Sequence, residues 1–220
     1  MKTDSQNTGP RGLGIGSRIG ETPRECPLNP LRGFRVACIG GSAGATEIYS
    51  EILRELKSDS GLAVIVVPHR SMRNPSRLVN LLALATHMSV VSINDGLLLS
   101  PNAIFVCPPG VHLRLDGVSL YLEVCRTWGW PTTLTCFLNS LADSEGPPSA
   151  AVILSGLGDD GSSALGAVKA SGGFVLAQSN PRWSGMTDSA VATGNVDLIL
   201  SSNGIATALM DFAGKSRRSA

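Results

Sequence analysis

The chain has 220 residues, enough for one good-sized domain or at most two small ones. Apolar residues make up 43% and charged residues 16%, a globular composition in which no apolar run approaches the roughly 20 residues that span a bilayer. The formal net charge of +1 gives no indication of a nucleic-acid partner or of insertion into a membrane.

The two ends of the chain differ in composition from its middle. The first 32 residues carry Gly, Pro, Ser, Thr and charge without an apolar period, and they lack the apolar core of a secretory signal. From Phe34 onward the apolar pattern becomes dense and regular. We therefore expect a flexible leader over 1–32, a single folded domain over 33–213 and a short basic tail over 214–220.

The first part of the domain alternates between strand-like and helix-like patterns. FRVACI (34–39) and LAVIVV (62–67) are short continuous apolar runs, typical of strands that are buried on both faces. Helices are expected over 46–56 and 74–85, the second with Asn74 as its N-cap.

The middle of the domain has a different pattern. Three short strands follow one another closely over 104–107, 111–115 and 119–124, and Asp116-Gly117 marks a tight hairpin turn between the last two. Alternation then resumes, and the elements expected are a helix over 132–143, a strand over 151–155, a helix over 161–172, strands over 174–178 and 197–200, and a helix over 204–213. This order predicts an α/β domain with a mostly parallel sheet and an inserted β-hairpin.

The cysteines are odd in number and include no CxxC pair; they are Cys26, Cys38, Cys107, Cys125 and Cys136. Residues in this pattern are more typical of small core hydrophobes than of a metal or redox site. We expect no metal, no other cofactor, and a location in the reducing cytoplasm.

The glycine-rich turn after the first strand reads Gly40-Gly41-Ser42-Ala43-Gly44. A dinucleotide-binding turn would have GxGxxG spacing and an acidic residue at the end of the second strand, and a phosphate-binding P-loop would continue with Gly-Lys-Ser/Thr. Neither is present in this chain. The turn does fit G-x-S-x-G, in which small neighbours expose a serine hydroxyl between a strand and a helix.

Other polar residues follow the expected strands at the same edge of the sheet. His69 comes directly after the second strand, and Asp159 and Asp160 follow the strand over 151–155. Together with Ser42 they offer a nucleophile, a base that takes its proton, and a carboxylate that orients the base. The order Ser, His, Asp differs from that of the α/β-hydrolases, in which the acid precedes the histidine.

Each of these residues also has a simpler interpretation. Ser42 fits the N-cap of the following helix, and the two aspartates precede a helix whose N-terminal dipole they would stabilise. His87, at a helix end, and His112, in a hairpin strand, compete with His69 but are more typical of surface or packing residues. The triad hypothesis rests on the convergence of three residue types, with the choice between the two aspartates left open.

Several motifs in order give the chain a specific resemblance. VACIGGSAGA, VIVVPH, DGLLLSPNAIFVCPPGVHLRL, AVILSGLGDDGSSALGAVKASGG and AQSNPRWSGMTDSAVATGNVDLIL are similar to the catalytic domain of CheB-type protein-glutamate methylesterases of bacterial chemotaxis. The resemblance covers roughly 34–213. It implies a doubly wound α/β sheet and a cytoplasmic serine esterase that removes methyl groups from glutamyl esters on chemoreceptors, and that also deamidates receptor glutamines.

The resemblance also implies roles for individual residues. Ser42 corresponds to the nucleophile and His69 to the base. Asp160 corresponds to the orienting acid, because the family places this acid immediately before the glycine of G-x-G-x-D-G. Backbone amides near Ala43 and Leu157 correspond to the oxyanion donors. The implied partner is the methylated cytoplasmic region of a chemoreceptor.

The chain departs from the family at four places. Gly44-Ala45 stands where the family usually has Gly-Gly, and Pro68 where it usually has Gln. WPTTL (130–134) stands where the family has Arg-Pro-Ser and an Asp two residues on, which predicts the loss of a substrate-rim contact or a hydrogen bond. The loop over 179–186 is shorter than usual. Members commonly carry a receiver domain, which a leader of this length cannot form.

These departures leave other functions open. One alternative is a carboxylesterase with a drifted substrate, consistent with the altered rim. The other is a catalytically weak module that docks on a receptor, although such a module has no need of all three triad residues.

Overall fold

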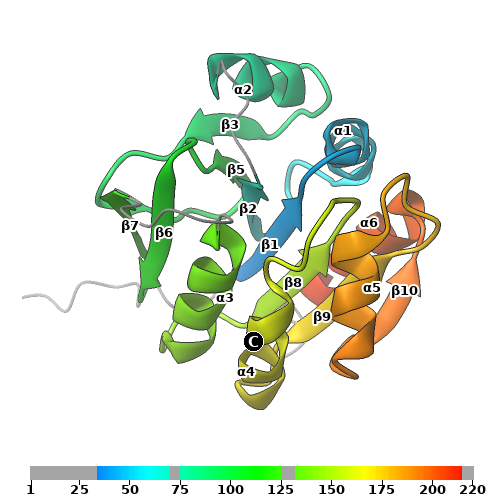
Figure 1. The fold of residues 1–220 in the computed structure, drawn as a ribbon. Coiled ribbons are helices and arrows are strands. Elements are labelled where there is room, and N and C mark those ends of the chain that lie inside the picture. Colours follow the sequence, from blue (N-terminus) through cyan, green and yellow to red (C-terminus); the bar gives the residue numbers. More distant parts are fainter. Residues whose placement is uncertain (1–33, 70–74, 125–131, 215–220) are drawn as a thin grey trace, which may run out of the picture.

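The computed structural model describes residues 34–69, 75–124 and 132–214 (Figure 1). The expected leader, the tail beyond Gly214, the Asn74 cap, two of the five cysteines and the first two residues of WPTTL lie outside the described residues. No helix in the described part of the chain is both long and apolar enough to cross a bilayer.

The described elements alternate between strands and helices over most of the chain. The strands are β1 (Arg35–Gly41), β2 (Leu62–Pro68), β3 (Ser89–Ser92), β4 (Leu97–Leu98), β5 (Ala103–Val106), β6 (Val111–Asp116), β7 (Ser119–Val124), β8 (Ser149–Ile153), β9 (Phe174–Gln178) and β10 (Leu198–Leu200). The helices are α1 (Ala45–Glu55), α2 (Pro75–Ala83), α3 (Thr133–Asp143), the 3₁₀ turn η1 (Ser162–Ala164), α4 (Leu165–Ala170), α5 (Gly185–Ala192) and α6 (Ser202–Gly214).

Within the described residues the main sheet has seven strands in the order β10-β9-β8-β1-β2-β5-β3, and every pairing in it is parallel. β1 lies in the middle, and its Ile39 is in register with Val66 of β2 and Val152 of β8. From β1 the chain adds β2, then the edge strand β3, and then β5 between them; it afterwards returns to the other side of β1 and adds β8, β9 and β10. The order therefore reverses next to β1, which is where open parallel sheets bind ligands.

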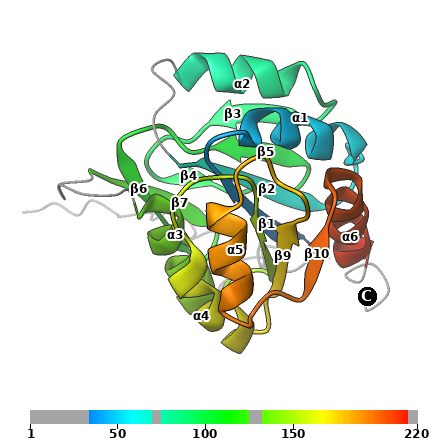
Figure 2. The same ribbon diagram turned by 45° about the vertical axis from the view of Figure 1, so that its right-hand side comes forward.

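Helices cover both faces of the sheet, as predicted for a doubly wound fold (Figure 2). Alternate residues of β1 point to opposite faces: Ala37 and Ile39 join a core with α1, α2 and α6, while Val36 and Cys38 join a core with α3, α4 and α5. Because both faces are covered, the central strands β1 and β2 are buried at every residue except the first of β1 and the last of β2, which explains their continuous apolar runs.

The hairpin is a small sheet of its own. β6 and β7 pair antiparallel, with Asp116 opposite Ser119, and the short β4 adds to the far side of β7. Gly117 in the turn has φ +59, the left-handed conformation that glycine adopts without a steric penalty. Apolar side chains of this sheet join the α3 face of the core, and the Leu115 amide donates a hydrogen bond to Ser140 Oγ of α3 at 3.0 Å.

Cys38 and Cys107 are small core residues, as the sequence predicts. Both are buried in the same apolar cluster, and both are free thiols. Burial raises the pKa of the Cys107 thiol to about 12. Burial, together with the nearby Cys107 and the carboxylate of Asp160, also raises the pKa of Cys38 well above its usual value.

Candidate functional site

The turn after β1 presents Ser42 at the carboxyl edge of the sheet. β1 ends at Gly41, and the Ser42 amide donates to the Ser155 carbonyl at 2.8 Å, which ties the turn to the segment after β8. Gly44, with φ +77, is the N-cap residue of α1, and no side chain caps this helix. The N-cap interpretation of Ser42 is therefore wrong: its hydroxyl is not used by the helix that follows.

Glycines allow the neighbouring segments to close around this turn. A methyl group added at Gly156 would lie 2.9 Å from Ser42 Cβ and would also collide with Met186. One added at Gly40 would collide with the buried side chain of Leu134. The loop after β8 and the start of α3 consequently approach Ser42 more closely than larger residues would permit.

His69 follows β2 directly and faces Ser42. Its amide donates to the Gly41 carbonyl at 2.7 Å, which continues the β1–β2 pairing by one residue and fixes the start of the loop. The side chain is buried, with Nδ1 3.2 Å from Ser42 Oγ. Nε2, on the other side of the ring, lies 3.9 Å from Asp160 Oδ2.

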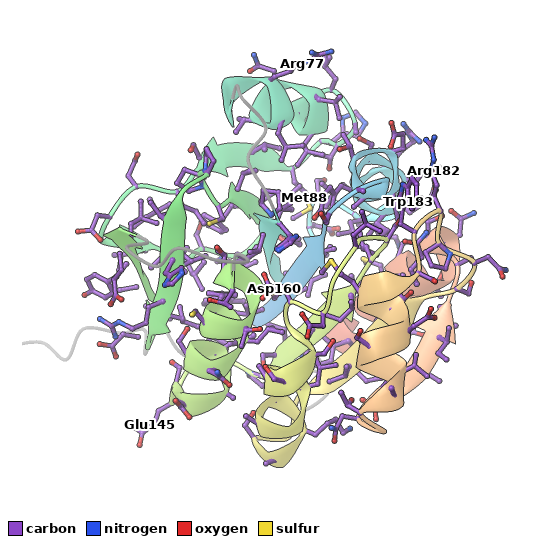
Figure 3. The ribbon with its side chains drawn as sticks, viewed as in Figure 1. Arg77, Met88, Glu145, Asp160, Arg182 and Trp183 are labelled. Carbon is purple, nitrogen blue, oxygen red and sulfur yellow. The ribbon has the colours of Figure 1, made fainter. Side chains whose placement is uncertain are left out.

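Asp160 is held by the N-terminus of α3 (Figure 3). Its Oδ2 accepts the Leu134 amide at 3.1 Å, and its Oδ1 accepts both the amide and the hydroxyl of Thr135, each at 2.9 Å. A carboxylate at a helix N-terminus is stabilised by the free amides and the helix dipole. The sequence predicts that Asp160 stabilises the helix that follows it, and this prediction is wrong. Asp160 caps α3, and its partner there, Leu134, lies 26 residues before it in the chain.

The structure brings together Ser42, His69 and Asp160, while Asp159 is exposed. A neutral His69 that accepts the serine proton at Nδ1 carries its own proton on Nε2, facing Asp160. The separation of 3.9 Å between His69 Nε2 and Asp160 Oδ2 is longer than a hydrogen bond, but it is short enough for a carboxylate to attract a positively charged ring.

The two expected oxyanion donors flank Ser42. Ala43 follows it in sequence, and Leu157 follows Gly156, which packs against its Cβ. Within the described residues, neither the Ala43 amide nor the Leu157 amide donates to a protein acceptor. Their role as oxyanion donors stays a prediction.

Two residues that support the site were not identified from the sequence. The Thr135 hydroxyl donates to Asp160 and accepts the Gly161 amide at 2.7 Å. The hydroxyl of Ser155, which is 1% exposed, donates to the Ala43 carbonyl at 2.8 Å and accepts the Trp183 amide at 3.0 Å. Ser155 was detectable in principle, since it is a polar residue at the carboxyl end of an expected strand; Thr135 carries no such signal within its helix.

The competing histidines lie elsewhere. His87 is exposed after α2, and His112 on β6 has Nδ1 3.8 Å from Cys136 Sγ. Among the described residues, no three His, Cys, Asp or Glu side chains gather in a way that could hold a metal ion.

The departures at Ala45 and Leu134 affect the interior. Both side chains are fully buried: Ala45, the first residue of α1, lies in the core on that face of the sheet, and Leu134 packs against Gly40. The backbone amide of Leu134 donates to Asp160, and this bond does not depend on the side chain at this position. The change at Leu134 therefore does not alter an exposed rim.

Comparison with known proteins identifies similar chains. The sequence profile described as CheB methylesterase matches residues 37–209. A protein-glutamate methylesterase/protein-glutamine glutaminase of Anaeromyxobacter dehalogenans is 33% identical over 205 residues, which cover 88% of this chain and 59% of that protein. An uncharacterised 104.1 kDa protein of Rhodobacter capsulatus is 35% identical over 61% of this chain, but only 14% of its own length is matched. The chain thus spans less than two thirds of these relatives.

Among solved structures, the catalytic domain of the Thermotoga maritima CheB methylesterase is similar with a TM-score of 0.74. The match covers 81% of this chain and 98% of that domain, at 23% sequence identity. At this identity the likeness establishes the doubly wound fold.

Proposed function

The chain belongs to the CheB methylesterase family, and we propose that it hydrolyses the methyl esters of glutamyl side chains in proteins, releasing methanol. The observation that carries the proposal is the arrangement of Ser42, His69 and Asp160. The imidazole lies between the hydroxyl and the carboxylate, next to β1, where the strand order of the sheet reverses. The fold alone would carry no activity, since function depends on the site.

The first half of the proposed reaction forms an acyl-enzyme. Ser42 Oγ attacks the ester carbonyl carbon while His69 Nδ1 takes the hydroxyl proton, and the carbonyl π electrons move to the oxygen. The Ala43 and Leu157 amides donate to this oxyanion. When it collapses, the C–O bond to the methoxy group breaks, and His69 returns its proton to the leaving oxygen, which departs as methanol.

The second half hydrolyses that intermediate. A water molecule attacks the acyl carbon as His69 takes one of its protons, and the second collapse returns that proton to Ser42 Oγ. The products are the glutamate carboxyl group and the original enzyme. Asp160 stabilises the imidazolium in both halves through its charge.

The same residues support deamidation of glutamine side chains. The acyl-enzyme is identical, and ammonia leaves in place of methanol after protonation by His69. The names of such relatives, protein-glutamate methylesterase/protein-glutamine glutaminase, include both activities. We propose the methylated cytoplasmic region of a chemoreceptor as the partner protein, and the cytoplasm as the place of the reaction.

The proposal is tested by methanol release from a methylated chemoreceptor fragment, measured for the native chain and for Ser42→Ala. Release by the native chain and its loss in the variant are expected. Release that persists in Ser42→Ala overturns the role of Ser42. No release from the fragment by the native chain, with hydrolysis of small methyl esters intact, indicates a carboxylesterase with another substrate.

A further inference from the structure

Two exposed apolar side chains flank the turn that carries Ser42. Leu157 is 49% exposed and Trp183 is 44% exposed. Leu157 follows Gly156, which packs on Ser42 Cβ, and a methyl group at Gly44 would lie 3.3 Å from Trp183 Cδ1. The two side chains therefore offer apolar surface to a molecule that binds beside Ser42.

The backbone of Trp183 is fixed even though its side chain is exposed. Its amide donates to Ser155 Oγ at 3.0 Å, and its carbonyl accepts the Gly156 amide at 2.9 Å. Ser155 in turn holds the Ala43 carbonyl. An aromatic side chain on a fixed backbone loses little conformational freedom on binding, which favours its use as an anchor for a partner.

The residue before Trp183 adds a positive charge. Arg182 is exposed and lies with Trp183 on the loop after β9, close to α1 (Figure 3). No carboxylate in the described part of the chain forms an ion pair with Arg182. A guanidinium next to an indole offers a carboxylate a charged hydrogen-bond donor beside an apolar surface.

Resting on the proposed glutamyl esterase activity, we propose that Leu157, Trp183 and Arg182 form a docking rim for the polypeptide segment around the ester. The rim favours segments that carry an apolar side chain and an unmodified carboxylate close to the glutamyl ester. A small free ester reaches Ser42 without lying across the rim, whereas a polypeptide has to pass over one side of it. The rim therefore acts on substrate choice and leaves the bond-breaking step to the triad.

The test compares esters that share the reacting group. The substrates are N-acetylglutamate γ-methyl ester amide and peptides in which the same ester is flanked by Leu and Glu, by Leu and Lys, or by Ser alone. The native chain is expected to prefer the Leu and Glu peptide. Trp183→Ala is expected to lower the ratio of kcat/KM for this peptide to that for the small ester by about tenfold, mainly through KM. Arg182→Glu is expected to shift the preference toward the Lys peptide.

The matched control is Leu198→Ala, which removes a side chain of similar exposure from the edge strand β10. It is expected to leave every ratio unchanged. An unchanged ratio in Trp183→Ala, or equal turnover of all peptides by the native chain, overturns the docking rim.

A binding measurement tests the docking rim even if the chain proves not to be an esterase. If the native chain hydrolyses none of the esters, binding of a fluorescent peptide with Gln in place of the ester is compared among the native chain, Trp183→Ala and Leu198→Ala. Weaker binding only in Trp183→Ala upholds the rim without the esterase. Equal binding by all three overturns it.

Discussion

Thr135 offers a sharp test of how Asp160 is positioned, because one hydroxyl makes two contacts. It donates to Asp160 Oδ1 at 2.9 Å and accepts the Gly161 amide at 2.7 Å. Thr135→Val keeps the shape of the side chain but removes both bonds. The carboxylate keeps two backbone donors, so it remains in place with less restraint.

The magnitude follows from the two bonds lost. A hydrogen bond to a charged group contributes about 2 kcal/mol, and an amide left without a partner costs about 1 kcal/mol more, so unfolding should become easier by about 3 kcal/mol. In the proposed mechanism Asp160 acts on His69 across 3.9 Å, so a loosened carboxylate should also lower kcat, by about tenfold, with little change in KM. Urea unfolding and the hydrolysis of a small methyl ester measure the two effects.

Two further variants separate positioning from general loss of stability. Thr135→Ser keeps the hydroxyl and should retain most of the native kcat. Thr133→Val removes a hydroxyl from the same helical turn that donates to the Val111 carbonyl at 3.3 Å and does not touch Asp160. Native kcat in Thr135→Val, or an equal loss in Thr133→Val, would refute the reasoning.

Three other variants test the site and the core. His69→Ala should lower ester turnover at least about a hundredfold through loss of the general base, and near-native turnover in the methanol assay would exclude that role. Asp160→Asn should lose most activity while Asp159→Asn keeps it, because only Asp160 faces His69; the reverse result would assign the acid to Asp159. The Cys107 pKa of about 12 lies above the usual value of 9.0, so the unfolded chain ionises first and stability should fall as the pH rises above about 9. Between about pH 8 and about pH 10 the ionisation of Cys107 in the unfolded chain should lower the free energy of unfolding by about 1 kcal/mol. The urea midpoint should therefore fall less over this pH range in Cys107→Ala than in the native chain. An equal fall in both would contradict the raised pKa of Cys107.

The strands and helices that the sequence predicts are those with strong apolar patterns. β1 and β2 are buried on both faces, so their composition alone marks them, and the hairpin is marked by its turn. The sequence does not predict β3, β4 or α5. β3 is a half-exposed edge strand of four residues, β4 has two residues, and α5 has too even a mixture of small and polar residues to show a helical period.

The candidate site also contains residues that the sequence predicts and residues that it does not. Ser42, His69 and Asp160 each follow a strand of one parallel sheet, so their meeting at one edge is a consequence of topology that alternating patterns reveal. The choice of Asp160 over Asp159 depends on which side chain turns inward, and residue pattern alone leaves it open. Thr135 and Trp183 depend on how α3 and the loop after β9 pack against the strand ends, which is tertiary information.

The position of Asp160 connects the stability of the fold with the chemistry of the site. A buried carboxylate without donors would favour its neutral form, which could not stabilise an imidazolium. Here the first turn of α3 supplies three hydrogen-bond donors to the Asp160 carboxylate. The carboxylate is therefore positioned by the helix, without any contribution from His69. In the proposed mechanism this arrangement lets the acid act across 3.9 Å without a direct hydrogen bond: a fixed charge in a buried site stabilises an imidazolium at that distance, while its hydrogen bonds to α3 keep it fixed.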